Sequence, residues 1–257
     1  MNNTDLSGLT AVVTGASSGI GEATAAALAG RGASVVVVAR RADRLQDLAA
    51  KITSDGGTAL PLAADITSPG QAGEVIARAA TAFGHDRIDI LVNNAGVMLL
   101  SPAASATMAE WQRMIDLNLT AAAACTHAAL PHLLRAAQEG PRRVADLVNI
   151  SSVAGRTVRP VSSIYAATKH GLGAFSESLR QEFTRSHLRV SLVEPGAVAT
   201  ELRDHLRQEM RAAQEKRFEG LETLQAADVA DAISYIVTRP RHVAINELLV
   251  RPTDQAD

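Results

Sequence analysis

The sequence predicts an α/β protein in which a doubly wound, seven-stranded parallel sheet carries helices on both faces. Short runs rich in β-branched residues recur along the chain, and longer alanine-rich segments separate them. The short runs are continuously apolar, which is typical of strands buried on both faces, as parallel strands covered by helices are. The seven candidate strands lie within residues 10–15, 33–40, 58–65, 88–96, 144–152, 189–196 and 246–252.

The segments between these strands are predicted to form helices. Residues 19–31 are rich in alanine, and residues 162–186 carry one apolar stripe at helical spacing. The stripe residues are Leu172, Phe175, Leu179 and Phe183. Alternation of strand and helix over residues 1–257 predicts a single domain, right-handed crossovers and a ligand site at the carboxyl ends of the strands.

Residues 201–224, which we call the lid segment, interrupt this alternation. The segment reads ELRDHLRQEMRAAQEKRFEGLETL, and it is charged, helix-prone and without a strand of its own. We interpret it as a helical lid over a substrate site. A solvated surface helix is the alternative interpretation for most of its length.

Composition and charge exclude several classes of protein. With 257 residues, 47% of them hydrophobic and 20% charged, the chain can bury one large core without disulfides. The formal net charge of −2 provides no global positive field, so neither nucleic acid nor a membrane is an expected partner. Cys125 is the only cysteine, which excludes an intrachain disulfide. Because the N-terminus has no basic start followed by a long apolar run, the cytoplasm is the expected location.

A glycine cluster follows the first candidate strand and opens the first candidate helix. Gly15, Gly19 and Gly21 lie in TGASSGIG, where a tight turn would let backbone N–H groups and the helix N-terminus face a phosphate. The spacing G-x-x-x-G-x-G differs from the widespread dinucleotide pattern G-x-G-x-x-G. An ordinary strand-to-helix turn is the alternative, but the position after the first strand of an α/β chain favours a nucleotide site.

The end of the second strand indicates which nucleotide this would be. An acidic residue that binds the ribose of NAD is expected there, and the chain has Ala39 followed by Arg40 and Arg41. Guanidinium groups favour a 2′-phosphate through charge-assisted hydrogen bonds. The sequence therefore predicts NADP(H) in preference to NAD(H). The alternative is that both arginines cap a strand on the solvated surface.

Tyr165 precedes Lys169 by four residues, which places both side chains on one face of a helix. A phenol has a pKa of about 10 and is a slow acid or base at neutral pH unless a nearby cation stabilises its anion. Lys169 is a candidate for that cation. Proximity on a helix alone is not proof of a chemical role.

Several motifs, in order along essentially the whole chain, resemble those of the short-chain dehydrogenase/reductase family. TGASSGIG resembles the cofactor loop of the family, NNAG at residues 93–96 its fourth-strand motif, and IDLNLT contains the matching Asn118. ISSVAG and YAATK follow, and the 13 residues from Ser152 to Tyr165 match the family spacing. EPGAVAT at residues 194–200 resembles the loop that holds the nicotinamide end. The resemblance implies a Rossmann fold.

The resemblance also implies roles for individual residues. Tyr165 would be the proton donor or base, Ser152 would bind the substrate oxygen, Lys169 would bind the nicotinamide ribose and lower the pKa of Tyr165, and Asn118 would connect Lys169 to solvent. The residues expected at the cofactor are Gly15, Ser17, Ser18, Gly19, Ile20, Gly21, Arg40, Arg41, Asp65, Ile66, Asn94, Ala95, Gly96, Tyr165, Lys169, Pro195, Gly196, Val198 and Thr200. Asn93 and Asn94 could equally satisfy backbone groups near a strand end, and Asn118 could be a helix-kink residue.

Residues expected at the substrate follow from the same family geometry. They are Met98, Val153, Arg156 and Leu202, with Arg159 and Arg203 nearby. Arg156 or Arg159 could bind a substrate carboxylate. Alternatively, either side chain could be a charged residue at a subunit interface.

The C-terminus indicates which subgroup of the family the chain resembles most. Many members of the family, including acyl-carrier-protein ketoreductases, end in a glycine-rich segment, whereas this chain ends VAINELLVRPTDQAD. The ending, together with NNAGVMLLSP, ALPHLLR and EPGAVATELR, is most similar to clavulanic acid dehydrogenase and related NADP-dependent aldehyde or hydroxy-acid dehydrogenases. The resemblance implies reduction of an aldehyde or ketone of a small or secondary metabolite, by a homotetramer or a dimer.

Three alternative functions are a metal-dependent enzyme, a regulator that binds NADP without turnover, and an acyl or polyketide ketoreductase of the same family. The seven histidines include no H-E-x-x-H or comparable spacing, so no metal is expected. A regulator that binds NADP without turnover is disfavoured by the complete serine, tyrosine, lysine and asparagine set. An acyl or polyketide ketoreductase of the same family is the third alternative.

Overall fold

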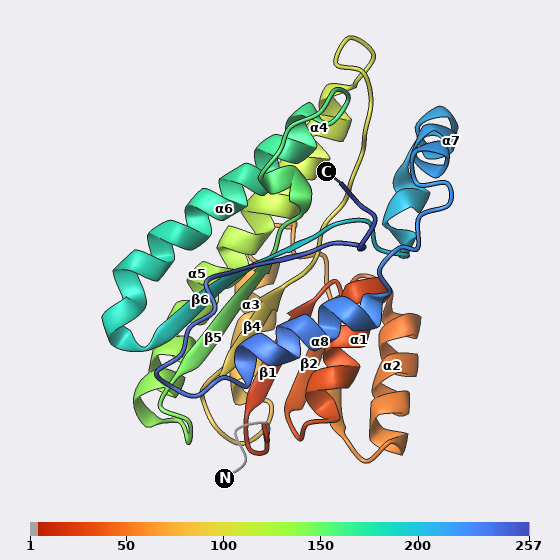
Figure 1. The fold of residues 1–257 in the computed structure, drawn as a ribbon. Coiled ribbons are helices and arrows are strands. Elements are labelled where there is room, and N and C mark those ends of the chain that lie inside the picture. Colours follow the sequence, from red (N-terminus) through yellow and green to blue (C-terminus); the bar gives the residue numbers. More distant parts are fainter. Residues whose placement is uncertain (1–4, 257) are drawn as a thin grey trace.

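A seven-stranded parallel sheet forms the middle layer of the computed structural model, which describes residues 5–256 (Figure 1). The strand order is β3-β2-β1-β4-β5-β6-β7, and every neighbouring pair is parallel. The strands are β1 (Thr10–Thr14), β2 (Ser34–Ala39), β3 (Thr58–Ala63), β4 (Ile90–Asn93), β5 (Ala145–Ile150), β6 (Leu188–Pro195) and β7 (Glu247–Val250). The predicted fold class and all seven candidate strands are confirmed.

Helices cover both faces of the sheet (Figure 1). Those whose apolar residues pack on one face are α1 (Gly19–Ala29), α2 (Ala42–Ser54) and α8 (Ala226–Val237). Those on the other face are α3 (Gln71–Thr81), α5 (Ala121–Glu139) and α6 (Ser163–Phe183). Two further helices are α4 (Met108–Ile115) and α7 (Gln208–Arg217).

The pleat of the central strands explains why their sequences are continuously apolar. Val13 and Val37 pack into the core beneath α1, α2 and α8, whereas Val12 and Val36 pack into the core beneath α3 and α5. Successive side chains of a strand point to opposite faces, and here both faces are buried. A polar residue at either set of positions would therefore lose its hydration.

The helix predicted over 162–186 is α6, which begins at Ser163 and continues through a 3₁₀ turn to Ser186. In its apolar stripe, Leu172 and Leu179 are buried and the two phenylalanines are half-buried. The stripe packs against α5 and the sheet. Packing of this stripe holds the helix in place and with it Tyr165 and Lys169.

The lid segment consists of a 3₁₀ helix (Glu201–His205), α7 and a connection that returns to the sheet. Leu224 forms a bridge with Val198 and closes the segment at its base. None of the described α7 residues is buried, and the helix stands apart from the sheet layers (Figure 1). Gln214 and Arg217 of α7 nevertheless line the same cavity as the 3₁₀ helix, and the lid interpretation stays a prediction. Among residues 5–256, no helix combines the length and apolar character needed to cross a bilayer.

Candidate active site

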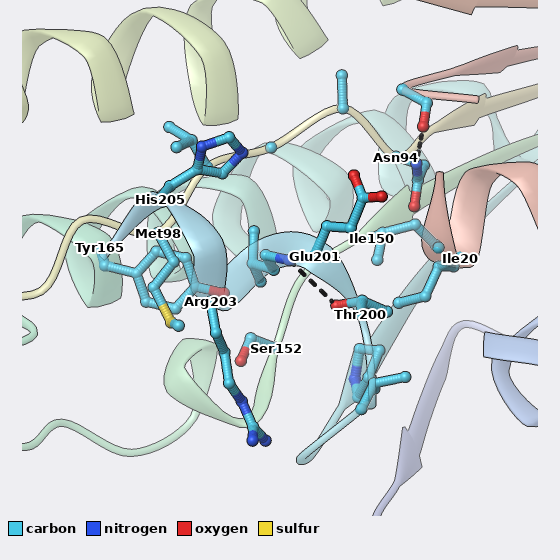
Figure 2. A pocket seen from close by; sticks show the side chains of 18 of the residues that line it. Ile20, Asn94, Met98, Ile150, Ser152, Tyr165, Thr200, Glu201, Arg203 and His205 are labelled. Atoms are coloured by element: carbon cyan, nitrogen blue, oxygen red, sulfur yellow. Dashed lines mark hydrogen bonds between the residues drawn. The ribbon is translucent and has the colours of Figure 1, made fainter. Parts of the chain in front are cut away.

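A cavity of about 460 Å³ opens at the carboxyl ends of the strands, where the strand order reverses between β1 and β4. The loops that follow β1 to β6 line it, together with the start of the lid segment. Figure 2 shows side chains from several loops around this space, including Ile20, Asn94, Met98, Ser152 and Tyr165. Segments far apart in the sequence therefore meet at one site.

Most of the predicted cofactor and substrate residues line this cavity. Those on its wall are Gly15, Ser17, Ser18, Gly19, Ile20, Arg40, Arg41, Asp65, Ile66, Asn94, Ala95, Gly96, Met98, Ser152, Val153, Tyr165, Lys169, Pro195, Gly196, Val198, Thr200 and Leu202. Within the described chain, Gly21, Asn118 and Arg156 are not among the lining residues. Gly21 and Asn118 are buried behind the wall, and Arg156 is exposed outside it.

The glycine loop brings the backbone of β1 against the backbone that follows β4. Gly15 has a φ of +68° and Gly19 a φ of +58°, conformations that side chains rarely adopt. A Cβ at Gly15 would lie 2.8 Å from the Cα of Ala95. Ser18 is the N-cap of α1 and lines the cavity, so the positive end of this helix faces the space where a phosphate would bind. This cradle fits the dinucleotide that the motif predicts.

Gly21 lies behind the cavity wall and packs against Asn94 and the glycine loop, and its predicted contact with the cofactor stays a prediction. A Cβ at Gly21 would lie 2.4 Å from Nδ2 of Asn94 and 2.5 Å from the carbonyl oxygen of Gly15. The same Nδ2 donates hydrogen bonds to the carbonyl oxygens of Thr14, at 2.9 Å, and Gly15, at 3.3 Å. Gly21 thus leaves room for the asparagine that ties the glycine loop to β4.

Replacing Gly21 with alanine is expected to displace Asn94, to lower the free energy of unfolding by about 1 to 3 kcal/mol and to weaken dinucleotide binding. Gly73→Ala is the control, because Gly73 lies within α3 and a Cβ there meets nothing within 4 Å. Removing a helical glycine there is expected to stabilise the protein by about 0.5 to 1 kcal/mol. Urea unfolding and calorimetric titration with cofactor would measure both effects. Equal stability of the two variants would contradict this explanation of Gly21.

Arg41 is bound to the glycine loop rather than lying on the open surface. Its Nε donates to Oγ of Ser17 at 3.1 Å, and its Nη2 donates to Oγ of Ser17 at 2.9 Å and to Oγ of Ser18 at 2.8 Å. Its Nη1 donates to Oε2 of Glu201 at 2.9 Å. Glu201 also lines the cavity and was not predicted.

Asp65 and Asn93 are engaged in local and buried hydrogen bonds. Oδ1 of Asp65 accepts from the hydroxyl of Thr67 at 2.7 Å and from its N–H at 3.1 Å, and these bonds hold the pKa of Asp65 below its usual value. Nδ2 of Asn93 donates to Thr126 and Asn149 inside the core. Asn93 therefore satisfies polar groups inside the core, which agrees with the structural alternative for this residue.

Ser152, Tyr165 and Lys169 meet on the cavity wall. The side chains of Ser152 and Tyr165 both line the cavity, and Oγ of Ser152 accepts from the N–H of Ala154 at 3.1 Å. Nζ of Lys169 donates to the carbonyl oxygen of Ile150 at 2.8 Å and lies 5.9 Å from the centre of the Tyr165 ring. The proton-carrying groups are thus held by β5 and α6 together.

Burial controls the ionisation of this pair. Burial raises the pKa of Tyr165, and the side chain of Ser152 opposes that rise. Burial also lowers the pKa of Lys169 to about 8. Burial is the largest influence on the pKa of Tyr165 in this structure, and the lowering of that pKa by Lys169 stays a prediction. Tyr165 is protonated at neutral pH, as a proton donor to a carbonyl requires.

Asn118 lies in a π-helical turn (Asp116–Thr120) between α4 and α5. Its Oδ1 accepts from the N–H of Val97 at 2.8 Å, and its Nδ2 donates to the carbonyl oxygen of Val97 at 2.9 Å and to Oγ1 of Thr168 at 3.2 Å. The side chain thus joins the loop after β4 to α6. These contacts agree with the helix-kink alternative, and the predicted link to solvent stays a prediction.

The prediction that Arg156 binds substrate is corrected. Its guanidinium is paired with Glu194 and Glu247 and is directed away from the cavity. Glu194 is almost fully buried at the end of β6, where burial raises its pKa, and a buried carboxylate requires a cationic or hydrogen-bonding partner. Arg159 lies on the cavity wall instead.

A family model described as short chain dehydrogenase matches residues 9–211. The chain belongs to the short-chain dehydrogenase/reductase family. It is 36% identical to an uncharacterized oxidoreductase of Staphylococcus saprophyticus over 95% of this chain and 96% of that protein. The protein is accordingly an oxidoreductase of the family.

Two solved structures illustrate the range of this family. The closed form of a serine dehydrogenase complexed with NADP⁺ is 31% identical, covers 97% of both chains and has a TM-score of 0.86. A 3-ketoacyl-(acyl-carrier-protein) reductase of Brucella melitensis complexed with NADH is 28% identical, covers 96% of this chain and 98% of that one, and has a TM-score of 0.82. The fold therefore accommodates either nicotinamide cofactor, and local residues must decide between them.

Family membership explains why sequence reasoning located the serine, tyrosine and lysine of the site but missed Glu201. The family motifs end at Thr200, and Glu201 contacts arginines that are about 160 residues earlier in the chain. No spacing rule predicts such a contact. Within residues 5–256, no group of three or more His, Cys, Asp or Glu side chains could hold a metal ion.

Proposed function

We propose that this protein is an NADP(H)-dependent oxidoreductase that reduces an aldehyde or ketone of a small or secondary metabolite to an alcohol, or catalyses the reverse oxidation. We place it in the clavulanic acid dehydrogenase-like subgroup of the family. The observation that carries the proposal is the meeting of Ser152, Tyr165 and Lys169 on the wall of one cavity, with Nζ of Lys169 5.9 Å from the centre of the Tyr165 ring.

In this proposal the nicotinamide, when bound, supplies or accepts the hydride. The hydroxyl of Ser152 donates a hydrogen bond to the substrate oxygen, and one of its lone pairs accepts from the N–H of Ala154, which leaves its proton available for the substrate. The hydroxyl of Tyr165 delivers a proton to the same oxygen during reduction and receives it back during oxidation. Lys169 binds the nicotinamide ribose, and its carbonyl partner Ile150 holds it in position.

In the same proposal, the other predicted cofactor residues bind different parts of the dinucleotide along the cavity. The glycine loop and α1 bind the phosphates, Asp65 and Ile66 the adenine, and residues 195–200 the nicotinamide carboxamide. Arg41, held by Ser17 and Ser18, is the donor that supports NADP(H) over NAD(H). A comparison of kcat/KM for NADPH and NADH tests the preference, and equal values would remove it.

Basic residues at the substrate end support a substrate with an anionic group. Arg113, Arg159 and Arg203 line the cavity there, and Arg203 lies 4.7 Å from the centre of the Phe218 ring. Burial, followed by the charge of Arg113, lowers the pKa of His205 at the same place. These groups make the substrate end locally positive, although the chain as a whole is slightly negative.

Replacing Arg203 with glutamine is expected to raise KM for carboxylate-bearing aldehydes about ten- to a hundredfold, because a charge-assisted hydrogen bond is lost. KM for neutral aldehydes is expected to change little. Arg159→Gln is expected to act in the same direction, and the exposed Arg185→Gln provides the matched control. Identical KM values across acidic and neutral substrates in both cavity variants would remove the anionic-substrate hypothesis.

An acyl or polyketide ketoreductase is the second candidate function, favoured by the structural similarity to the 3-ketoacyl-(acyl-carrier-protein) reductase. A screen of NADPH consumption over aldehydes, ketones and thioester-bound ketones separates the two functions. Free aldehydes or ketones are expected to be the better substrates. A homodimer or homotetramer and a cytoplasmic location stay predictions, and light scattering of the purified protein measures the first.

A further inference from the structure

A carboxylate of the lid segment lies between Arg41, which lines the cavity, and Arg44 of α2, which is not among the lining residues. Oε2 of Glu201 accepts a hydrogen bond from Nη1 of Arg41 at 2.9 Å, and Oε1 accepts from Nη1 of Arg44 at 2.6 Å. Figure 2 shows Glu201 beside Thr200 at the cavity. The contact joins the start of the lid segment to the end of β2 and the start of α2.

All three nitrogens of the Arg41 guanidinium have internal acceptors. Nε and Nη2 donate to Ser17 and Ser18, and Nη1 donates to Glu201. Arginine has five N–H donors in a fixed planar arrangement, and these bonds use four of them, so a phosphate that makes more than one hydrogen bond to Arg41 must share or replace an acceptor. The two serine hydroxyls can rotate and donate to a phosphate, but a carboxylate has no proton to donate.

Glu201 remains an anion at every working pH, because hydrogen bonds from Arg41 and then Arg44 hold its pKa at about 2. A 2′-phosphate near Arg41 would meet this negative charge. The three side chains of this group are each a little over 40% exposed, so solvent screens their interactions and the effect of the contact is moderate.

We propose that Glu201 is a specificity-determining residue, whose carboxylate competes with the 2′-phosphate of NADP(H) for Arg41 and Arg44. Binding of the 2′-phosphate releases Glu201 and thereby loosens the start of the lid segment. NAD(H) has no 2′-phosphate and leaves the contact in place. The inference rests on the proposed nicotinamide cofactor and adds Arg44 to the residues that receive the phosphate.

Calorimetric titrations of the full chain with NADP⁺, NAD⁺ and adenosine 2′,5′-bisphosphate test the proposal. Glu201→Gln keeps the shape of the side chain and removes its charge. It is expected to tighten binding of NADP⁺ and the bisphosphate about three- to tenfold and to leave NAD⁺ within about twofold of the original protein. Glu209→Gln, on the exposed side of the lid segment, makes the same charge change and is expected to alter none of the three affinities.

Each other outcome contradicts a specific part of the proposal. Unchanged NADP⁺ affinity in Glu201→Gln, or an equal change for NAD⁺, would overturn the competition. Weaker NAD⁺ binding alone would overturn it in favour of Glu201 as a reader of the ribose hydroxyls. If the original protein bound neither dinucleotide nor the bisphosphate, the proposed nicotinamide cofactor itself would be wrong. An unchanged NADP⁺ affinity, or an equal change for NAD⁺, would contradict only the competition and not the cofactor.

Arg44 and the lid segment provide independent measurements. Arg44→Gln is expected to weaken NADP⁺ and bisphosphate binding a few-fold without affecting NAD⁺. Saturation with NADP⁺ is expected to speed hydrogen exchange of the amides at 201–206, whereas saturation with NAD⁺ is not. Slower exchange with NADP⁺ than with NAD⁺ would show that the contact is retained and would overturn the release of the lid segment.

Discussion

Replacing Tyr165 with phenylalanine is expected to lower kcat for carbonyl reduction by about 10²- to 10⁴-fold, because the phenol is the group placed to protonate the substrate oxygen. The ring would remain packed among Val97, Leu99, Met114 and Leu206, so the fold is expected to persist. Affinity for the dinucleotide is expected to stay within a few-fold of the original. The loss would thus be in the chemical step.

Steady-state kinetics with NADPH and titration of cofactor binding separate these effects. Tyr235 is the only other tyrosine, and it is exposed on α8, so Tyr235→Phe is the matched control with unchanged kcat. Ser152→Ala is expected to reduce kcat as well, through loss of the hydrogen bond to the substrate oxygen. Full activity of Tyr165→Phe would falsify the proposed mechanism.

Replacing Lys169 with methionine is expected to abolish activity and to raise the free energy of unfolding at pH 7 by about 2 to 3 kcal/mol. Burial lowers the pKa of this lysine from 10.5 in the unfolded chain to about 8, so folding must bury a cation at neutral pH. Loss of the hydrogen bond to Ile150, worth about 1 kcal/mol, offsets part of the gain. The lysine is thus retained at the expense of stability, as functional groups often are.

The pH dependence of this effect has a definite sign. Between pH 8 and pH 10.5 the unfolded chain holds a proton on Lys169 that the folded chain has released, so stability of the original protein rises with pH in this window. The advantage of the methionine variant therefore shrinks as the pH rises above 8. Urea unfolding at pH 7 and pH 9.5 measures it, with the exposed Lys216→Met as control. A methionine variant less stable than the original protein at pH 7 would contradict the burial argument.

Much of the site could be predicted because local sequence rules act over short distances. Ser152 and Tyr165 are separated by a 3₁₀ turn, the connection 156–162 and the start of α6, and the 13-residue spacing of the family motif identified both residues. The position of Arg156 between Ser152 and Tyr165 in the sequence did not predict the direction of its side chain. Its direction depends on Glu194, whose burial follows from the packing of β6 between β5 and β7.

The sequence by itself determined the layers of the fold and the residues of the proposed catalytic group. Continuously apolar runs require burial on both faces, and an apolar stripe requires a helix that packs, wherever the rest of the chain lies. Only the tertiary structure decided that Gly21 makes room for Asn94, that burial raises the pKa of Tyr165, and that Glu201 meets Arg41. Ionisation and long-range ion pairs depend on which surfaces lose water together, and that is established only when distant segments pack.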